Sequence, residues 1–275
     1  MSRMVNTIIS ALFLTSAIGA SAQDKERDTQ VSSPTSTGTM EVAMIQPNEA
    51  AILPLVRLPS LGLSKAKKYE PKIDPANFTA GVVDNPFFPL RPGTVFHYAE
   101  KNRNKVNDNE VTVTKATKVI LGVTCVVVHD TLKDKKGTLI EDTLDWYAQD
   151  RDGNVWYFGE DTKEYDDKGN AHTKGSWEAG VKGAQPGIIM PAHAKAGGAK
   201  YRQEYLKGEA EDNGQVVATN DKVNVPAGKY TGCIRTKEWS DLESGSEKKW
   251  YAKGIGFVRS ESKDGGVVEL VSVTN

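Results

Sequence analysis

Residues 139–160 read LIEDTLDWYAQDRDGNVWYFGE, and this stretch decides the fold class. It holds two segments rich in β-branched and aromatic residues, 139–149 and 154–160, on either side of Asp152-Gly153. Asp-Gly is typical of the tight turns that join adjacent antiparallel strands. The stretch therefore predicts a β-hairpin.

The same pattern repeats on both sides of this hairpin. Further strands are expected at 94–100, 110–120, 123–132, 200–208, 215–223, 232–239, 248–252, 256–262 and 267–273. Turns are expected at Lys168-Gly169, Asn213-Gly214, Lys253-Gly254 and Asp264-Gly265. No helical period is evident, so we predict an all-β antiparallel domain, a calycin-like barrel or half-barrel. A sandwich stays open.

The N-terminus has the three parts of a secretory signal peptide in the right order. Arg3 supplies a positive charge, residues 8–18 are apolar, and Ala20-Ser21-Ala22 forms a small-residue cleavage site. The apolar part is too short to span a bilayer. We expect residues 1–22 to be removed, with no lipid-anchoring cysteine beside the cleavage site, and the protein to be periplasmic or secreted.

Residues 23–77 are predicted to be a disordered or extended linker, because their polar and proline-broken sequence can bury little apolar surface. A single β domain should occupy residues 78–275. The chain has 35 Lys+Arg against 36 Asp+Glu, which argues against nucleic acid as the main partner. No later segment is long and apolar enough for a membrane span, and the oligomeric state is open.

The segment 139–149 has two different faces. One carries Glu141, Thr143, Asp145, Tyr147 and Gln149, and the other is apolar. The polar face lies either in solvent or inside a barrel or cleft. Carboxylates beside tryptophan or tyrosine recur in later segments, and ligand pockets combine aromatic walls with a few polar anchors.

On that pattern the favoured function is binding of a small or envelope-derived ligand. The candidate ligand-binding residues are Asp145, Tyr147, Trp156, Glu160, Trp177, Glu178, Glu204, Tyr205, Glu238 and Trp239. An ordinary sheet with alternating charged and aromatic residues would give the same pattern. No cofactor is expected.

Whether the protein is an enzyme is undecided, and no catalytic residues are assigned. A hydrolase using two of the carboxylates is one alternative, and a non-catalytic module that contacts an envelope partner is another. No metal site is expected, because no histidine or cysteine pair has ligand spacing. Residues 150–154 and 166–170 resemble parts of calcium loops but lack the full ligand series, which favours hairpin turns.

The chain contains two cysteines, Cys125 and Cys233. In an oxidising compartment they could form a disulfide. Two separate buried thiols are the other possibility, because a disulfide requires a Cα spacing that sequence does not reveal.

Several motifs resemble those of an uncharacterised family of exported bacterial β-rich proteins. They are GSWEAG at 175–180, GAQPGI with MPA between 183 and 192, VPAGKY at 225–230 and TKEW at 236–239. The resemblance covers about residues 78–273. It implies that 175–192 is a defined part of the fold, and it brings no established chemistry.

Overall fold

The computed structural model describes residues 68–103 and 105–275. The expected signal peptide and most of the expected linker therefore lie outside the described residues. The described part is all-β and antiparallel, as the sequence predicts, and its one helical element is the 3-10 turn η1 (Pro75–Asn77). Within it, no helix is long and apolar enough to cross a membrane.

One sheet contains every strand of the described residues. The first five are β1 (Val95–Asn102), β2 (Lys105–Ile120), β3 (Val123–Asp134), β4 (Leu139–Gln149) and β5 (Val155–Tyr165). Five short strands follow: β6 (Ala171–His172), β7 (Trp177–Glu178), β8 (Gln185–Met190), β9 (Tyr201–Arg202) and β10 (Glu204–Tyr205). The last five are β11 (Asp212–Val225), β12 (Gly228–Ser240), β13 (Glu247–Ala252), β14 (Gly256–Ser262) and β15 (Val267–Thr274).

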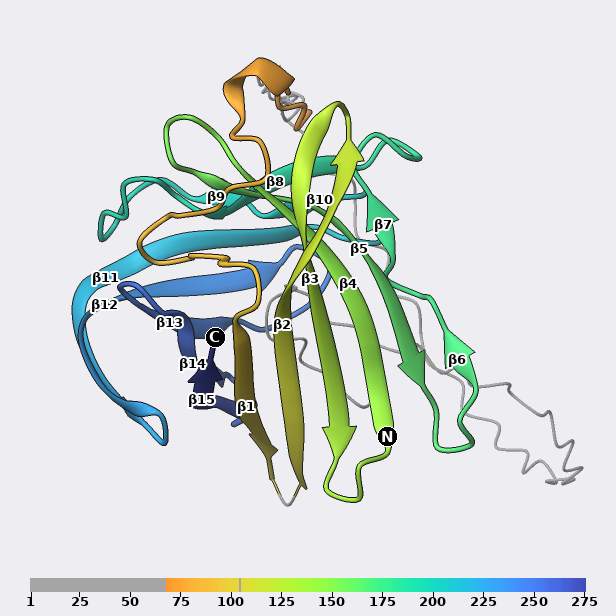
Figure 1. The fold of residues 1–275 in the computed structure, drawn as a ribbon, viewed down its shortest axis with the longest axis vertical. Helices are drawn as coiled ribbons and strands as arrows, with labels where there is room; N and C mark the ends of the chain where they lie inside the picture. The colour runs from red at the N-terminus through yellow and green to blue at the C-terminus, as the bar shows by residue number, and fades with distance from the viewer. Residues whose placement is uncertain (1–67, 104) are drawn as a thin grey trace, which may run out of the picture. The chain divides into compact units, whose positions relative to one another are not determined.

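The strand order is β10-β8-β5-β4-β3-β2-β1-β15-β14-β13-β12-β11-β9, with β6 and β7 paired to β5. The long strands β1 to β4 run side by side in Figure 1, and the blue strands from β11 to β15 continue the wall. The predicted hairpin is present between β4 and β5. Its turn has Gly153 at φ +95°, and the Asp150 carboxylate accepts a hydrogen bond from the Asn154 backbone at 2.8 Å.

Residues 201–205, here called the seam, join the two ends of the sheet. The β9 end of the seam pairs with β11 and the β10 end pairs with β8. Between them, the Gln203 backbone N–H donates to the Asp212 carbonyl at 2.8 Å. The seam passes so close to Gly187 of β8 that a Cβ there would lie 2.4 Å from the Arg202 carbonyl oxygen. The sheet is thereby nearly closed into a barrel.

Gly214 also contributes to the closure of the barrel. The sequence predicts a turn at Asn213-Gly214, and this prediction is wrong, because both residues lie inside β11 and pair with β9. A Cβ at Gly214 would lie 2.5 Å from the Tyr201 ring. Glycine here makes room for an aromatic side chain of the seam rather than for a turn.

The two faces of β4 show which residues enter the barrel. Glu141, Thr143, Asp145 and Tyr147 are all buried, whereas Leu144 between them is 36% exposed. The polar face of this strand therefore lies inside, which decides between the two interpretations of the 139–149 pattern. Apolar side chains of other strands, including Val111, Val128, Ile234, Val258 and Leu270, fill another part of the interior.

The disulfide possibility is not supported. Cys125 on β3 and Cys233 on β12 are both buried and both free thiols. Five strands lie between β3 and β12 in the sheet. A disulfide needs Cα atoms within about 7 Å, which strands so far apart in the order do not provide.

Candidate functional site

Buried charge is the unusual feature of the barrel interior. Among the described residues, the buried carboxyl groups belong to Glu100, Asp130, Glu141, Asp145, Glu160, Glu204, Asp212, Glu238 and Glu247. The one buried basic side chain of that part of the chain is Lys249. Acidic side chains are rarely fully buried unless they are paired. These carboxyl groups far outnumber the one buried ammonium group, so the interior is rich in acidic side chains.

Lys249 is held between two of the carboxylates. Its Nζ lies 3.1 Å from Glu238 Oε2 and 3.5 Å from Glu247 Oε2. The other Glu238 oxygen accepts from the Thr236 hydroxyl at 2.7 Å and from the Tyr251 hydroxyl at 3.2 Å. These two carboxylates raise the pKa of Lys249 although burial opposes its charge, so the lysine stays protonated.

A second group lies where β4, β5 and β7 meet. Asp145 is directly opposite Glu160 in the β4–β5 register, and Trp177 is opposite Glu160 on β7. Tyr157 donates its hydroxyl to Asp145 at 2.7 Å. Its ring stacks on Tyr147 with 4.9 Å between centroids and meets the Trp177 ring edge-on at 5.3 Å. Carboxylates and aromatic faces are thus combined in one place.

The seam adds polar groups that no neighbour satisfies. Both carboxylate oxygens of Glu204 and both amide atoms of Gln203 are buried without a hydrogen-bond partner. The hydroxyls of Tyr201 and Tyr147 are also buried without a hydrogen-bond partner. Each such group costs about 1–3 kcal/mol relative to a satisfied one. Native structures contain few of them, and each needs an explanation.

The pKa of Glu204 is raised well above its usual value, first by burial and then by the nearby Asp212 carboxyl. The Trp177 indole N–H and Lys249 lower it to a smaller extent, although the indole lies outside hydrogen-bond geometry. Burial also raises the pKa of Asp212 to about 7, against the effects of Ser240 and Lys249. The pair therefore retains a proton under conditions in which exposed carboxyls have none.

The residues that the sequence singles out divide between the two faces of the wall. Asp145, Tyr147, Glu160, Trp177, Glu204 and Glu238 are buried within the described domain. Trp156, Glu178, Tyr205 and Trp239 are only partly buried and have other partners: Asp150, Lys118, Tyr69 and Lys200, respectively. Whether any of them binds a ligand stays a prediction.

Sequence reasoning missed Tyr201, Gln203, Asp212 and Lys249 as site candidates. For Lys249 the sequence does contain a signal, because Glu247, Lys249 and Tyr251 alternate and so lie on one face of β13. The structure shows that all three are buried. The seam residues have no such signal, because β9 and β10 are two residues long. A period of two cannot be recognised in so short a strand.

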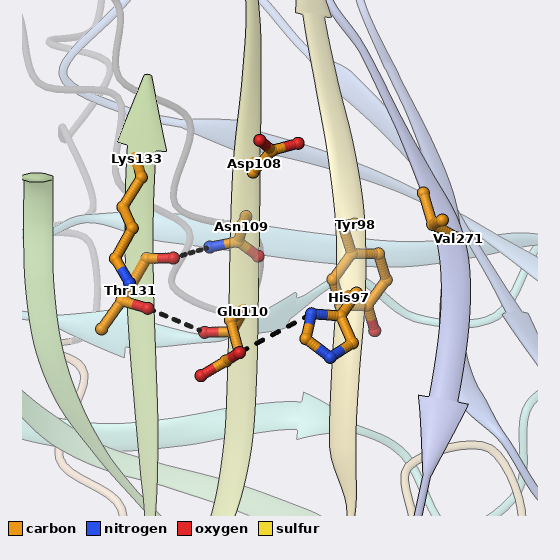
Figure 2. Close-up of a pocket in the computed structure, with 8 residues that line it drawn as sticks. All are labelled: His97, Tyr98, Asp108, Asn109, Glu110, Thr131, Lys133 and Val271. Atoms are coloured by element: carbon orange, nitrogen blue, oxygen red, sulfur yellow. Dashed lines mark hydrogen bonds and ion pairs between the residues drawn. The ribbon is translucent and has the colours of Figure 1, made fainter. Parts of the chain in front are cut away.

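The outer wall has a pocket of its own, of about 240 Å³, over β1, β2, β3 and β15. Figure 2 shows His97 and Glu110 facing each other across it, with Lys133 at one side. The His97 Nδ1 to Glu110 Oε2 distance is 3.7 Å, and the two side chains are 42% and 50% exposed. Such a contact is weak, because water and salt screen it.

Metal-binding geometry does not occur among the residues that the structure describes. No three of their histidine, cysteine, aspartate or glutamate side chains are grouped to hold an ion. The two calcium-like sequences form turns instead. Asp166, for example, accepts hydrogen bonds from the backbone and side-chain nitrogens of Asn170, each at 2.9 Å.

Comparison with known proteins gives two structural likenesses. No family profile and no curated protein matches the chain. A solved structure from Bacteroides fragilis, described as a candidate exported protein with a YmcC-like fold, is 18% identical with a TM-score of 0.43. A candidate lipoprotein from Parabacteroides distasonis is 13% identical with a TM-score of 0.40. Each likeness covers 69% of this chain and 99% of the other. Likenesses this distant carry no functional argument.

Proposed function

We propose that this chain is an exported protein whose barrel interior binds a small polar ligand beside the seam. The observation that carries the proposal is the set of unsatisfied buried groups on Tyr147, Tyr201, Gln203 and Glu204. A ligand that hydrogen-bonds to them would offset the cost of burying them. The proposed compartment, the periplasm or the extracellular space, rests on the signal-like residues 1–22.

The aromatic side chains support binding in the same region. Tyr147, Tyr157 and Trp177 are in mutual ring contact beside Asp145 and Glu160. Aromatic surfaces with a few polar anchors are the usual composition of small-molecule sites. The outer pocket offers no comparable set, because His97 and Glu110 within it are about half exposed and contact each other.

A thermal-shift screen of small envelope-derived compounds tests the proposal, with two matched variants. Glu204→Gln keeps the shape of the seam but removes its carboxylate. Glu261→Gln changes a glutamate whose carboxylate is paired with Arg259 at 2.8 Å on the outer side of the wall. We expect at least one compound to raise the melting temperature of the wild type and of Glu261→Gln, with a smaller shift in Glu204→Gln.

Two outcomes would contradict the proposal. One is that no compound shifts the wild type. The other is that every hit is retained in full by Glu204→Gln and also by Tyr147→Phe, which removes a hydroxyl that has no partner. The compounds would then be binding on the outer wall and not inside the barrel.

A hydrolase is the second candidate, and one observation favours it. Glu204 and Asp212 are neighbouring buried carboxyls that both have raised pKa values, with that of Asp212 at about 7. A carboxyl that keeps its proton near neutral pH can act as a general acid. Mass spectrometry of each hit after incubation separates the two functions, because a bound ligand is recovered intact and a substrate is cleaved.

A further inference from the structure

The balance of charge inside the barrel points to one class of ligand. Lys249 is the single buried basic side chain among the described residues, and its Nζ is already shared by Glu238 and Glu247. Glu204 is fully buried, and neither of its oxygens accepts a hydrogen bond. The seam therefore presents a buried carboxyl group whose hydrogen-bond acceptors are left unused by the described protein groups.

The surroundings of Glu204 add acidic groups from other strands. Asp212 of β11 and Asp145 of β4 act on it electrostatically from their own positions, and Lys249 of β13 is the opposing cation. Like charges held this close in a water-poor interior disfavour each other's ionisation. A positive charge placed among them would remove that cost.

The aromatic neighbours suit the same ligand. Tyr147, Tyr157 and Trp177 form a continuous set of ring contacts. The faces of aromatic rings attract ammonium groups, and desolvated sites strengthen that attraction. A site that combines carboxylates with aromatic faces therefore favours an organic cation over a neutral or anionic molecule.

The arrangement also separates an organic cation from a metal ion. A metal needs several oxygen ligands converging on one point, and no such group of three occurs in the described part of the chain. The acidic groups are instead spread over different strands. An ion of molecular size, with its own hydrogen-bond donors, can reach several of them.

Building on the proposed function, we infer that the ligand is an organic cation with a primary ammonium group that donates hydrogen bonds to Glu204. The Tyr147 and Tyr201 hydroxyls and the Gln203 amide supply the remaining polar contacts. Binding of such a ligand draws a proton from the neighbouring carboxyls, because the added positive charge favours their ionised form.

Matched probes that differ in charge test this inference. The pairs are putrescine with 1,4-butanediol, and D-glucosamine with N-acetyl-D-glucosamine, measured by isothermal titration calorimetry on the purified protein. We expect the amine of at least one pair to bind at least tenfold more tightly than its neutral partner at pH 7.5. Glu204→Gln should weaken that binding at least tenfold, and Glu261→Gln should leave it unchanged.

Proton linkage gives a second readout that a loss of structure would not mimic. Titrations of the wild type in two buffers with different ionisation enthalpies should reveal proton release on binding. The affinity should also fall between pH 7.5 and pH 5, because protonated carboxyls no longer attract the cation. Tyr147→Phe keeps every carboxylate. It should therefore lower the affinity for the amine and preserve this pH dependence.

The outcomes separate the ligand class from the proposed function. One outcome is that the neutral partner binds as tightly as the amine and that Tyr147→Phe weakens its binding. The interior then binds a ligand, and the inference that this ligand is a cation is wrong. If an amine binds equally well to wild type and Glu204→Gln, the seam is not its anchor and the inference falls. If neither amine binds, the inference falls, and the broader compound screen decides the proposed function by itself.

Discussion

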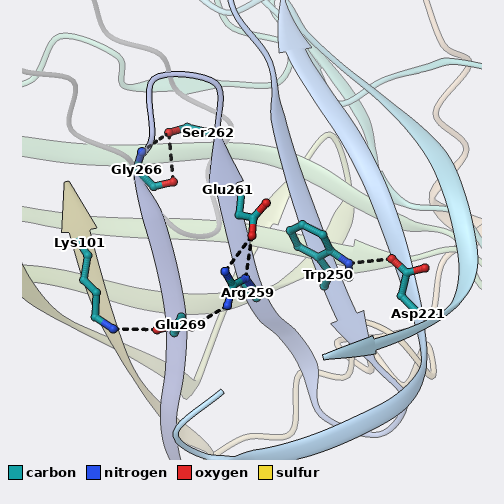
Figure 3. A network of polar contacts seen from close by, with 8 residues as sticks. All are labelled: Lys101, Asp221, Trp250, Arg259, Glu261, Ser262, Gly266 and Glu269. Atoms are coloured by element: carbon teal, nitrogen blue, oxygen red, sulfur yellow. Dashed lines mark hydrogen bonds and ion pairs between the residues drawn. The ribbon is translucent and has the colours of Figure 1, made fainter. Parts of the chain in front are cut away.

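All three side-chain nitrogens of Arg259 on the outer face donate to carboxylates of Glu261 and Glu269, at 2.7–3.2 Å, whereas neither oxygen of the buried Glu204 accepts a hydrogen bond. Figure 3 shows the outer network, which Lys101 extends by a 2.7 Å contact with Glu269. Its members are partly exposed, so water can also hydrate them. The outer charges thus have both partners and solvent, and several interior groups have neither.

This difference shows where the fold tolerates a loss of stability. Paired charges on an outer wall contribute little to stability, because water already solvates them. Unpaired polar groups in an interior reduce it. Hydrophobic side chains at positions 201, 203 and 204 would close the same seam without that cost, which is the reason for proposing that the polar groups there bind a ligand.

The largest expected effect separates a buried ion pair from an outer one. Lys249→Met leaves the Glu238 and Glu247 carboxylates without their cation, and breaking a buried pair in this way costs about 3–5 kcal/mol. Lys101→Met removes a cation that is 48% exposed and should cost about 1 kcal/mol or less. Urea unfolding measures both. Equal losses in the two variants would show that the interior is as well solvated as the outer wall.

The hairpin at 139–160 shows how much the sequence reveals. Its alternation and its Asp-Gly turn were sufficient to predict β4, β5 and the antiparallel class. The same alternation placed Asp145 and Tyr147 on one face and left open whether that face meets solvent. Burial of the whole face depends on barrel closure, which is decided by contacts about fifty residues away in the seam.

The candidate site was less accessible to sequence reasoning. Glu204 and Trp177 were singled out because carboxylates and aromatics recur near each other, and both are buried. Glu178 and Trp239 were included for the same reason and are only partly buried. Trp177 and Glu178 belong to the two-residue strand β7, and neighbouring residues of a strand face opposite sides. Proximity in sequence therefore selected residues from both faces of the wall.

A smaller effect is expected from protonation of the interior. Burial, with Glu141 and Glu247 nearby, raises the pKa of Glu100 from 4.5 to about 7, and the Asn107 hydrogen bond opposes this. Below pH 4.5 both the folded and the unfolded chain hold the proton. Between pH 4.5 and 7 the unfolded chain loses it first, so stability falls, by up to about 3 kcal/mol, and then stays constant.

Glu100→Gln removes this loss. Its free energy of unfolding should exceed that of the wild type by up to about 3 kcal/mol at pH 8, and the two should converge at pH 4. Glu110→Gln is the control, because Glu110 lies on the outer face with its side chain 50% exposed. A stability difference for Glu100→Gln that is the same at pH 4 and pH 8 would mean that its carboxyl is not held in an acidic interior.

The smallest effect concerns the closure that creates the inside of the barrel. Gly187→Ala places a methyl group 2.4 Å from the Arg202 carbonyl and from the Gln203 backbone, so the seam must move away from β8. Overpacking of this kind costs about 1–3 kcal/mol. Gly245→Ala is the control, because a Cβ there meets nothing within 4 Å. Amide exchange gives the sharper readout, since the Gln203 N–H that donates to Asp212 should exchange faster in Gly187→Ala. If that amide keeps its protection while global stability falls, the strain has spread into the sheet instead, and the seam is a rigid part of the barrel rather than its weakest closure.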